Sequence, residues 1–227
     1  MEVVARRNLL LGVLLLLQSF SPARPQCRTV CTGVVIDVVF LVDTSGSIQD
    51  ATSWSDMKTF LRNTLERMDV GEDRMHVSLI TYSTNINVIW DLDEYWDVED
   101  MLDAIDDLDD PPNGDTNTAA AIEYAVYDVF DGSNGDRNDA MDYLVLITDG
   151  ENSDGAQDAI DEGENAKEEG VYIYAVGVGD NISVTTLQQI AANKWDYVIA
   201  DDFQNIESIT ESLLSGIDCP CTTQGVV

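Results

Sequence analysis

The chain has 227 residues, of which 44% are hydrophobic and 24% are charged, so it is long and apolar enough to bury the core of one domain. Its 43 acidic residues outnumber 11 lysines and arginines, which gives a formal net charge of −32. A chain this acidic repels nucleic acids and anionic membrane surfaces and attracts cations. We therefore expect no nucleic-acid partner.

Residues 1–23 have the pattern of a secretory signal peptide. Arg6 and Arg7 precede the apolar run NLLLGVLLLL, and the small residues Ser21 and Ala23 stand at positions −3 and −1 of a cut after Ala23. The apolar run of about ten residues is shorter than the roughly 20 residues that span a bilayer, and no later segment reaches that length. We expect a secreted mature chain without a transmembrane segment.

Two short segments, residues 24–35 and 218–227, hold all the cysteines: Cys27, Cys31, Cys219 and Cys221. In an oxidising compartment these cysteines predict disulfide bonds that tie the two ends of the domain together, and all three pairings stay open. Zinc binding is disfavoured, because neither pair has the Cys-x2-Cys spacing. One or two cysteines could instead bond to other chains and give a disulfide-linked oligomer.

Between the cysteines, short apolar runs rich in Val, Ile and Tyr alternate with amphipathic stretches of helical length. In chain order, the predicted strands are residues 34–43, 75–83, 86–92, 143–149, 171–179 and 196–200. The predicted helices are residues 53–68, 98–108, 117–130, 154–170, 183–194 and 205–217. This alternation predicts one α/β domain over residues 36–217, with a doubly wound, mainly parallel central sheet flanked by helices.

Polar side chains gather in three loops that follow predicted strands or lead into predicted helices. The loops read DTSGS, GDTNT and TDGENSDG, and their candidate ligands are Asp43, Ser45, Ser47, Thr116 and Asp149. In doubly wound sheets, ligands bind beyond the carboxyl ends of the strands, where these loops would meet. Carboxylate and hydroxyl oxygens without sulfur or imidazole suit a hard divalent cation, Mg²⁺ or alternatively Mn²⁺ or Ca²⁺.

The segment DTSGS by itself is more typical of a turn that enters a helix, with its Asp or Ser capping backbone N–H groups. The combination with Thr116 and Asp149 is what favours a metal site over a capped turn.

The pattern Asp-x-Ser-x-Ser at residues 43–47, the threonine of GDTNT and the aspartate of LITDG resemble the metal-ion-dependent adhesion site of von Willebrand factor type A domains. The resemblance covers residues 36 to about 217. TDGENSDG and GDTNTAAAI are similar to loops of collagen-binding integrin I domains, and the flanking cysteines resemble those of matrilins and collagen VI. One position departs from the pattern, since Asn113 stands where the loop often has a glycine.

This resemblance implies a role for each candidate ligand. Ser45 and Ser47 would bind the ion directly, Thr116 directly or through water, and Asp43 and Asp149 mainly through bound waters. A carboxylate of a collagen or another matrix protein would complete the coordination. The resemblance thus implies an adhesion module of the extracellular matrix that binds without catalysis, and we expect no enzymatic activity.

The excess of acidic residues leaves a second function open. An acidic structural protein of a mineralised tissue, such as shell or skeleton, could use diffuse carboxylates to collect Ca²⁺ or to lie on mineral. The acidic residues are spread through helices and loops and do not form long Asp runs. We therefore keep this function as the alternative.

Three other features have simpler interpretations. A Ser-His-Asp hydrolase needs a histidine beside its nucleophile, but the only histidine, His76, lies inside a predicted strand and is expected to be structural. Residues 131–142 carry acids at some EF-hand positions, but Asp136 stands where that loop requires glycine, so a solvated loop is favoured. Asn181 begins the sequon Asn-Ile-Ser and is a candidate for glycosylation in an exposed loop.

Overall fold

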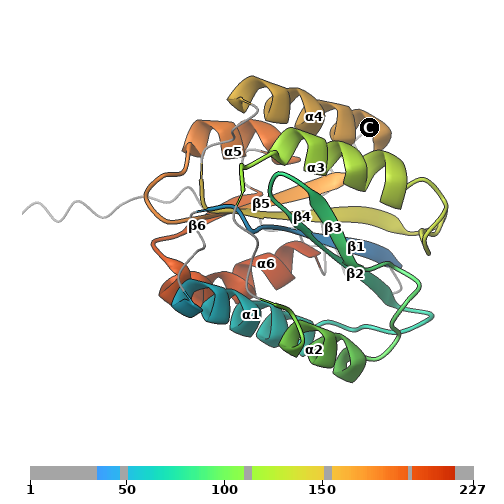
Figure 1. The fold of residues 1–227 in the computed structure, drawn as a ribbon. Helices are drawn as coiled ribbons and strands as arrows, with labels where there is room; N and C mark the ends of the chain where they lie inside the picture. The colour runs from blue at the N-terminus through green and yellow to red at the C-terminus, as the bar shows by residue number, and fades with distance from the viewer. Residues whose placement is uncertain (1–34, 47–50, 110–113, 151–154, 194–195, 218–227) are drawn as a thin grey trace, which may run out of the picture.

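Six strands form one sheet in the order β3-β2-β1-β4-β5-β6 in this computed structural model (Figure 1). The strands are β1 (Ile36–Asp43), β2 (Met75–Tyr82), β3 (Ile86–Trp90), β4 (Met141–Thr148), β5 (Tyr172–Val178) and β6 (Tyr197–Ala200). Only the β2–β3 pair is antiparallel, and every other neighbouring pair is parallel. The predicted doubly wound, mainly parallel sheet is confirmed.

The structure describes residues 35–46, 51–109, 114–150, 155–193 and 196–217. The signal peptide (1–23), the four cysteines and Ser47 lie outside the described residues. The signal peptide and the disulfide bonds of Cys27, Cys31, Cys219 and Cys221 therefore stay predictions.

Helices cover both faces of the sheet (Figure 1). One face is covered by α1 (Ala51–Leu65), α2 (Val98–Asp106) and α6 (Thr210–Ile217), and the other by α3 (Thr118–Tyr124), α4 (Ala156–Glu169) and α5 (Val184–Ile190). Two predicted helices are not α-helical throughout: α3 continues into the π-helical segment η1 (Ala125–Val129), and the 3-10 segment η2 (Phe203–Ile209) precedes α6. No described helix is long and apolar enough to cross a membrane.

The central strand β1 shows why this sequence forms a sheet buried on both sides. All eight of its residues are buried. Val38, Phe40 and Val42 pack in the core on the α1 face, whereas Val39 and Leu41 pack in the core on the α3 face. Because side chains alternate along a strand, an unbroken apolar run fills both cores at once. Asp43 ends this strand at the carboxyl edge of the sheet.

Candidate metal centre

Asp43 is the buried carboxylate at the centre of the carboxyl edge. Its Oδ1 accepts a hydrogen bond from the Ser45 backbone N–H at 2.9 Å, and its Oδ2 accepts one from the Thr148 hydroxyl at 2.9 Å. Burial raises the pKa of Asp43, and hydrogen bonds from Ser45, Thr148 and the Asp149 backbone oppose that rise. Among the described residues, no lysine, arginine or histidine forms an ion pair with Asp43. Its charge is therefore supported by neutral donors alone.

Backbone contacts join the loop after β1 to its neighbours. The Thr44 N–H donates to the Tyr82 carbonyl at 2.7 Å, and the Thr44 hydroxyl donates to the same oxygen at 3.0 Å. The Gly46 N–H donates to the carbonyl of Gly114 at 3.2 Å, so this loop also contacts the loop that leads into α3. These contacts hold the serine-bearing and threonine-bearing loops next to each other.

Gly114 allows two of these loops to approach closely. A Cβ atom at this position would lie 2.7 Å from the Thr84 hydroxyl oxygen and 3.1 Å from that of Ser83. The Asp115 N–H next to it donates to the Thr84 hydroxyl at 2.9 Å. A larger residue would push the loop before α3 away from β2, and with it Thr116.

Four of the five predicted ligands lie at this one edge. Asp43, Ser45, Thr116 and Asp149 are all buried, and their loops follow β1, precede α3 or follow β4. Hydrogen bonds link Asp43 directly to Ser45 and Asp149, and the Gly46–Gly114 contact brings the loop of Thr116 alongside. The fifth, Ser47, lies outside the described residues. Coordination of a metal by these residues stays a prediction.

Sequence reasoning missed two residues behind the predicted ligands. Thr148, the last residue of β4, donates its hydroxyl hydrogen to Asp43. Tyr82, the last residue of β2, is buried, and its hydroxyl oxygen lies 3.3 Å from Thr118 Oγ1. Burial and the carboxylate of Asp43 raise the pKa of Tyr82, so its phenol stays protonated. Tyr82 faces Asp43 in the β1–β2 register, and this strand-end position is the signal that could have identified it.

The donor set of this edge fits a divalent cation. A buried carboxylate whose pKa is raised by burial, with no cationic side chain beside it, is stabilised when a positive charge arrives. The carboxylate of Asp149 and the hydroxyls of Ser45 and Thr116 add hard oxygen donors of the kind that Mg²⁺ and Mn²⁺ prefer. We refer to this edge, defined by Asp43, Ser45, Thr116 and Asp149, as the metal edge.

A different acidic cluster lies at the opposite edge of the sheet. Carboxylate oxygens of Asp37, Asp136 and Asp142 lie within 4.8 Å of one another. Asp37 is neutralised by Arg137, whose backbone N–H donates to Oδ2 at 2.8 Å and whose Nε donates to Oδ1 at 2.9 Å. Burial and the charges of Asp136 and Asp37 raise the pKa of Asp142 to about 7. Of the residues 131–142 expected to form a solvated loop, 131–134 are exposed, whereas Asp136 is half-buried and Asp142, also half-buried, already belongs to β4.

Two other expectations concern single side chains. His76 is buried on β2, and its ring nitrogens face the carbonyl oxygens of Gly135 and Glu72 at 3.2 and 3.0 Å, so the expected structural role is supported. Asn181 is exposed just after β5, as expected, and its glycosylation stays a prediction.

The sheet order and the oxygen-lined carboxyl edge define a doubly wound α/β domain with a candidate cation site. The sequence profile of the von Willebrand factor type A domain matches residues 37–212, and the chain belongs to this family.

Curated relatives are large extracellular and adhesion proteins. The chain is 31% identical over 202 residues to the transmembrane cell adhesion receptor mua-3 of Caenorhabditis elegans, covering 87% of this chain and 5% of the receptor. It is 33% identical over 192 residues to the human collagen alpha-6(VI) chain, covering 84% of this chain and 8% of the collagen chain. It is 31% identical over 209 residues to Gallus gallus matrilin-1, covering 89% of this chain and 41% of the matrilin. The chain thus spans less than half the length of these relatives.

Solved structures share the fold. Proximal thread matrix protein 1 from the mussel byssus, with a zinc-occupied MIDAS motif, matches with a TM-score of 0.75 at 24% identity and covers 80% of this chain and 47% of its own. The manganese-loaded TRAP protein of Plasmodium vivax matches with a TM-score of 0.67 at 20% identity, and the match covers 80% of this chain and 74% of the TRAP chain. Both neighbours hold a divalent metal.

Proposed function

We propose that this domain is a secreted binding module that holds a divalent cation at the metal edge and uses it to bind a carboxylate of an extracellular matrix protein, without catalysis. The main observation behind this proposal is that Asp43 is a fully buried carboxylate whose described partners are all neutral. A charge buried in this way is normally paired or metal-bound. The metal-occupied neighbours and the matrix relatives support the same function.

The residues of the metal edge would have two different roles in holding the ion. Ser45 and Thr116, together with Ser47, would offer hydroxyl oxygens to the ion, and Asp43 and Asp149 would orient bound waters. A bound Mg²⁺, Mn²⁺ or Ca²⁺ would supply an electron-poor coordination position for the partner's carboxylate. Because most direct ligands are neutral, the ion would keep enough positive charge to attract that carboxylate. Collagen is the proposed partner, because the sequences TDGENSDG and GDTNTAAAI resemble loops of collagen-binding integrin I domains.

The test measures binding of the purified chain to immobilised collagen in Mg²⁺ and in EDTA. We expect binding in Mg²⁺ that EDTA and Asp43→Ala each abolish, and that the control Asp100→Ala, an exposed change on α2, preserves. Collagen binding that survives both EDTA and Asp43→Ala contradicts the proposal. Adsorption to calcite that Asp43→Ala does not change would favour the acidic structural role instead.

A further inference from the structure

The proposed ligand and the protein carry charge of the same sign. The partner's carboxylate is an anion, whereas this chain has a formal net charge of −32. Like charges repel during approach, and the repulsion is felt over about one Debye length, roughly 8 Å at physiological salt. A carboxylate can reach the ion readily only if something offsets this repulsion.

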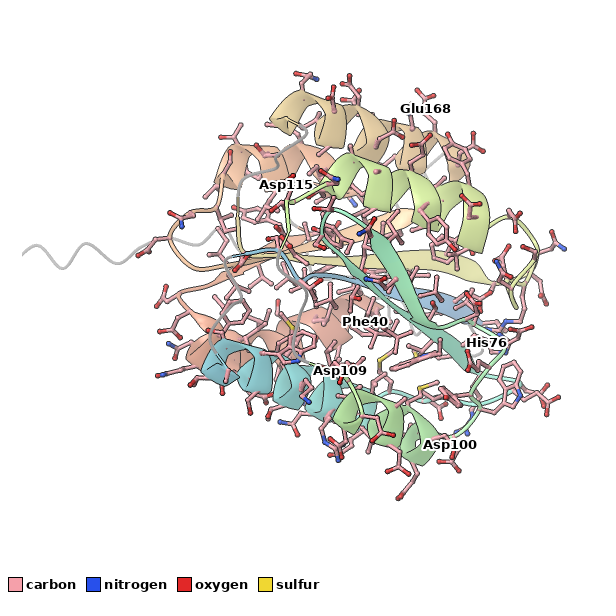
Figure 2. All side chains as sticks on the ribbon, in the orientation of Figure 1. Phe40, His76, Asp100, Asp109, Asp115 and Glu168 are labelled. Atoms are coloured by element: carbon pink, nitrogen blue, oxygen red, sulfur yellow. The ribbon has the colours of Figure 1, made fainter. Side chains whose placement is uncertain are left out.

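Exposed aspartates lie beside the metal edge on the loops that surround it. Asp115 directly precedes Thr116, Asp180 follows β5, and Asp201 and Asp202 follow β6; all four are exposed. Figure 2 shows Asp115 at the start of α3. Neighbouring strands are about 4.8 Å apart, so the ends of β5 and β6 lie roughly 5 and 10 Å to the side of the end of β4, which Asp149 follows. We call Asp115, Asp180, Asp201 and Asp202 the acidic rim.

No basic side chain offsets the acidic rim within the described part of the chain. The six lysines and arginines there all contact a carboxylate or a backbone carbonyl of their own chain, in the pairs Lys58–Leu108, Arg62–Asp106, Arg67–Glu211, Arg74–Asp69, Arg137–Asp37 and Lys167–Gln189. The described residues that follow the parallel strands or directly precede α3 at this edge, residues 44–46, 83–85, 114–117, 149–150, 179–183 and 201–202, include no lysine or arginine. The described loops around the metal edge therefore carry acidic side chains and no basic ones.

We propose that the partner presents its carboxylate within a basic segment, whose lysine or arginine side chains contact the acidic rim while the carboxylate reaches the metal edge. The inference rests on the proposed function and names the chemistry of its partner. Opposite charges beside the carboxylate turn repulsion into attraction and speed the encounter. The same rim rejects acidic segments without basic flanks, which is discrimination by unfavourable contacts.

Two triple variants separate the acidic rim from net charge. The rim variant carries Asp115→Asn, Asp180→Asn and Asp201→Asn, which remove three charges with little change of shape. The control variant carries three equivalent changes at exposed sites on α2 and α4, namely Asp100→Asn, Asp103→Asn and Glu168→Gln. Figure 2 shows Asp100 and Glu168 away from the start of α3.

Three peptides of equal length probe the two variants and the original chain, in Mg²⁺, by NMR titration at millimolar peptide. One has a central Glu flanked by lysines, one has the same Glu flanked by serines, and one has Gln flanked by lysines. We expect the lysine-flanked Glu peptide to bind about tenfold more tightly than the serine-flanked one at low salt, and this ratio to shrink at high salt. In the rim variant, the two Glu peptides should bind with nearly equal affinity, whereas in the control variant the affinity ratio should stay about tenfold.

The outcomes distinguish the inference from the proposed function. If the two Glu peptides bind the original chain with equal affinity, or if the rim variant keeps the affinity ratio, the proposed role of the acidic rim is contradicted. The proposed metal-dependent function is not affected by either result. An equal loss in the control variant also overturns it, because net charge then explains the effect. If the lysine-flanked Gln peptide binds as tightly as its Glu counterpart, or if EDTA does not weaken binding of the Glu peptide, the metal-dependent carboxylate contact of the proposed function is contradicted.

Discussion

The strand β1 carries a buried aspartate near each end, and the two have opposite surroundings. Asp37 and Asp43 are both 0% exposed. Asp37 is held by the backbone and side chain of Arg137, and His76 Nδ1 lies 3.8 Å from Asp37 Oδ1. Among the described residues, Asp43 is held by the hydroxyls of Ser45 and Thr148 and by backbone N–H groups. One carboxylate is neutralised inside the fold, and the other is left for a cation from outside.

This difference separates stability from binding along a single strand. A buried ion pair leaves a costly charge behind when one partner is removed. A buried carboxylate without a pair opposes folding until a cation binds, because burial favours its neutral form. We therefore expect changes at the Asp37 end to alter stability without metal dependence, and changes at the Asp43 end to alter metal dependence above all.

Replacing Arg137 should have the largest effect. Arg137→Ala leaves Asp37 buried without its main partner, and we expect the free energy of unfolding to fall by about 3 kcal/mol in urea denaturation. Arg67→Ala removes an exposed pair with Glu211 and should cost less than about 1 kcal/mol. Similar losses in the two variants would show that the Asp37–Arg137 pair has no special role.

Replacing Asp43 should abolish stabilisation by metal. At a metal concentration of 100 times the dissociation constant, a bound ion adds about 2.7 kcal/mol to the free energy of unfolding. Asp43→Asn should lose this gain, measured as the shift in melting temperature between Mg²⁺ and EDTA, while Asp103→Asn on α2 keeps it. A metal-dependent shift that persists in Asp43→Asn would place the ion elsewhere.

Tyr82→Phe should weaken the metal edge without unfolding the protein. The change removes a hydroxyl that contacts Thr118 and also Thr148, the residue that donates to Asp43. Residues that support metal ligands typically affect metal affinity by about tenfold or more. We expect about a tenfold loss of Mn²⁺ affinity in calorimetric titration. Tyr174→Phe is the matched control, since it removes a tyrosine hydroxyl that contacts Ser212 of α6, near the start of β5 and not at its carboxyl end. Equal metal affinities in the two variants would contradict a role for Tyr82.

Asp142→Asn should have the smallest effect, and a pH-dependent one. The pKa of Asp142 is raised to about 7 from 3.8, so the folded chain keeps a proton that the unfolded chain releases above about pH 4. The free energy of unfolding therefore falls as pH rises from about 4 to 7 and stays low above that. Because Asp142 is partly exposed, we expect its replacement to add about 1 kcal/mol above pH 7 and nothing near pH 4.

Urea denaturation across this pH range checks the prediction for Asp142. Asp100→Asn, which removes an exposed carboxylate on α2, serves as the control. A pH dependence that is the same in Asp142→Asn and in the unchanged chain would rule out Asp142 as its source.

Much of the fold could be predicted because its signals are local. Strands buried on both faces appear as apolar runs, and the helices between them show amphipathic periodicity. The π-helical segment η1 could not be predicted, since its sequence AVYDV continues the helical pattern of α3 without a break. The antiparallel direction of β3 depends on its short connection to β2 and on its edge position, which the apolar pattern alone does not specify.

The candidate site was predicted only where residue types carry the signal. Asp43, Ser45, Thr116 and Asp149 could be identified because oxygen-bearing side chains follow strands or lead into helices at one edge. The pair of Asp37 and Arg137 joins residues 100 apart in the sequence, and no local pattern connects them. Tyr82 and Thr148 belong to strands, where an apolar or β-branched residue is expected for packing alone.

The pairing of β1 on both sides has a mechanical consequence. β1 pairs with β2 along its whole length and with β4 from Ile36 to Val42, in parallel on each side. A pull on Asp43 along the strand axis would load both ladders in shear, so that many hydrogen bonds share the force instead of breaking one after another. A partner attached at this edge would therefore pull on the most firmly anchored strand of the sheet.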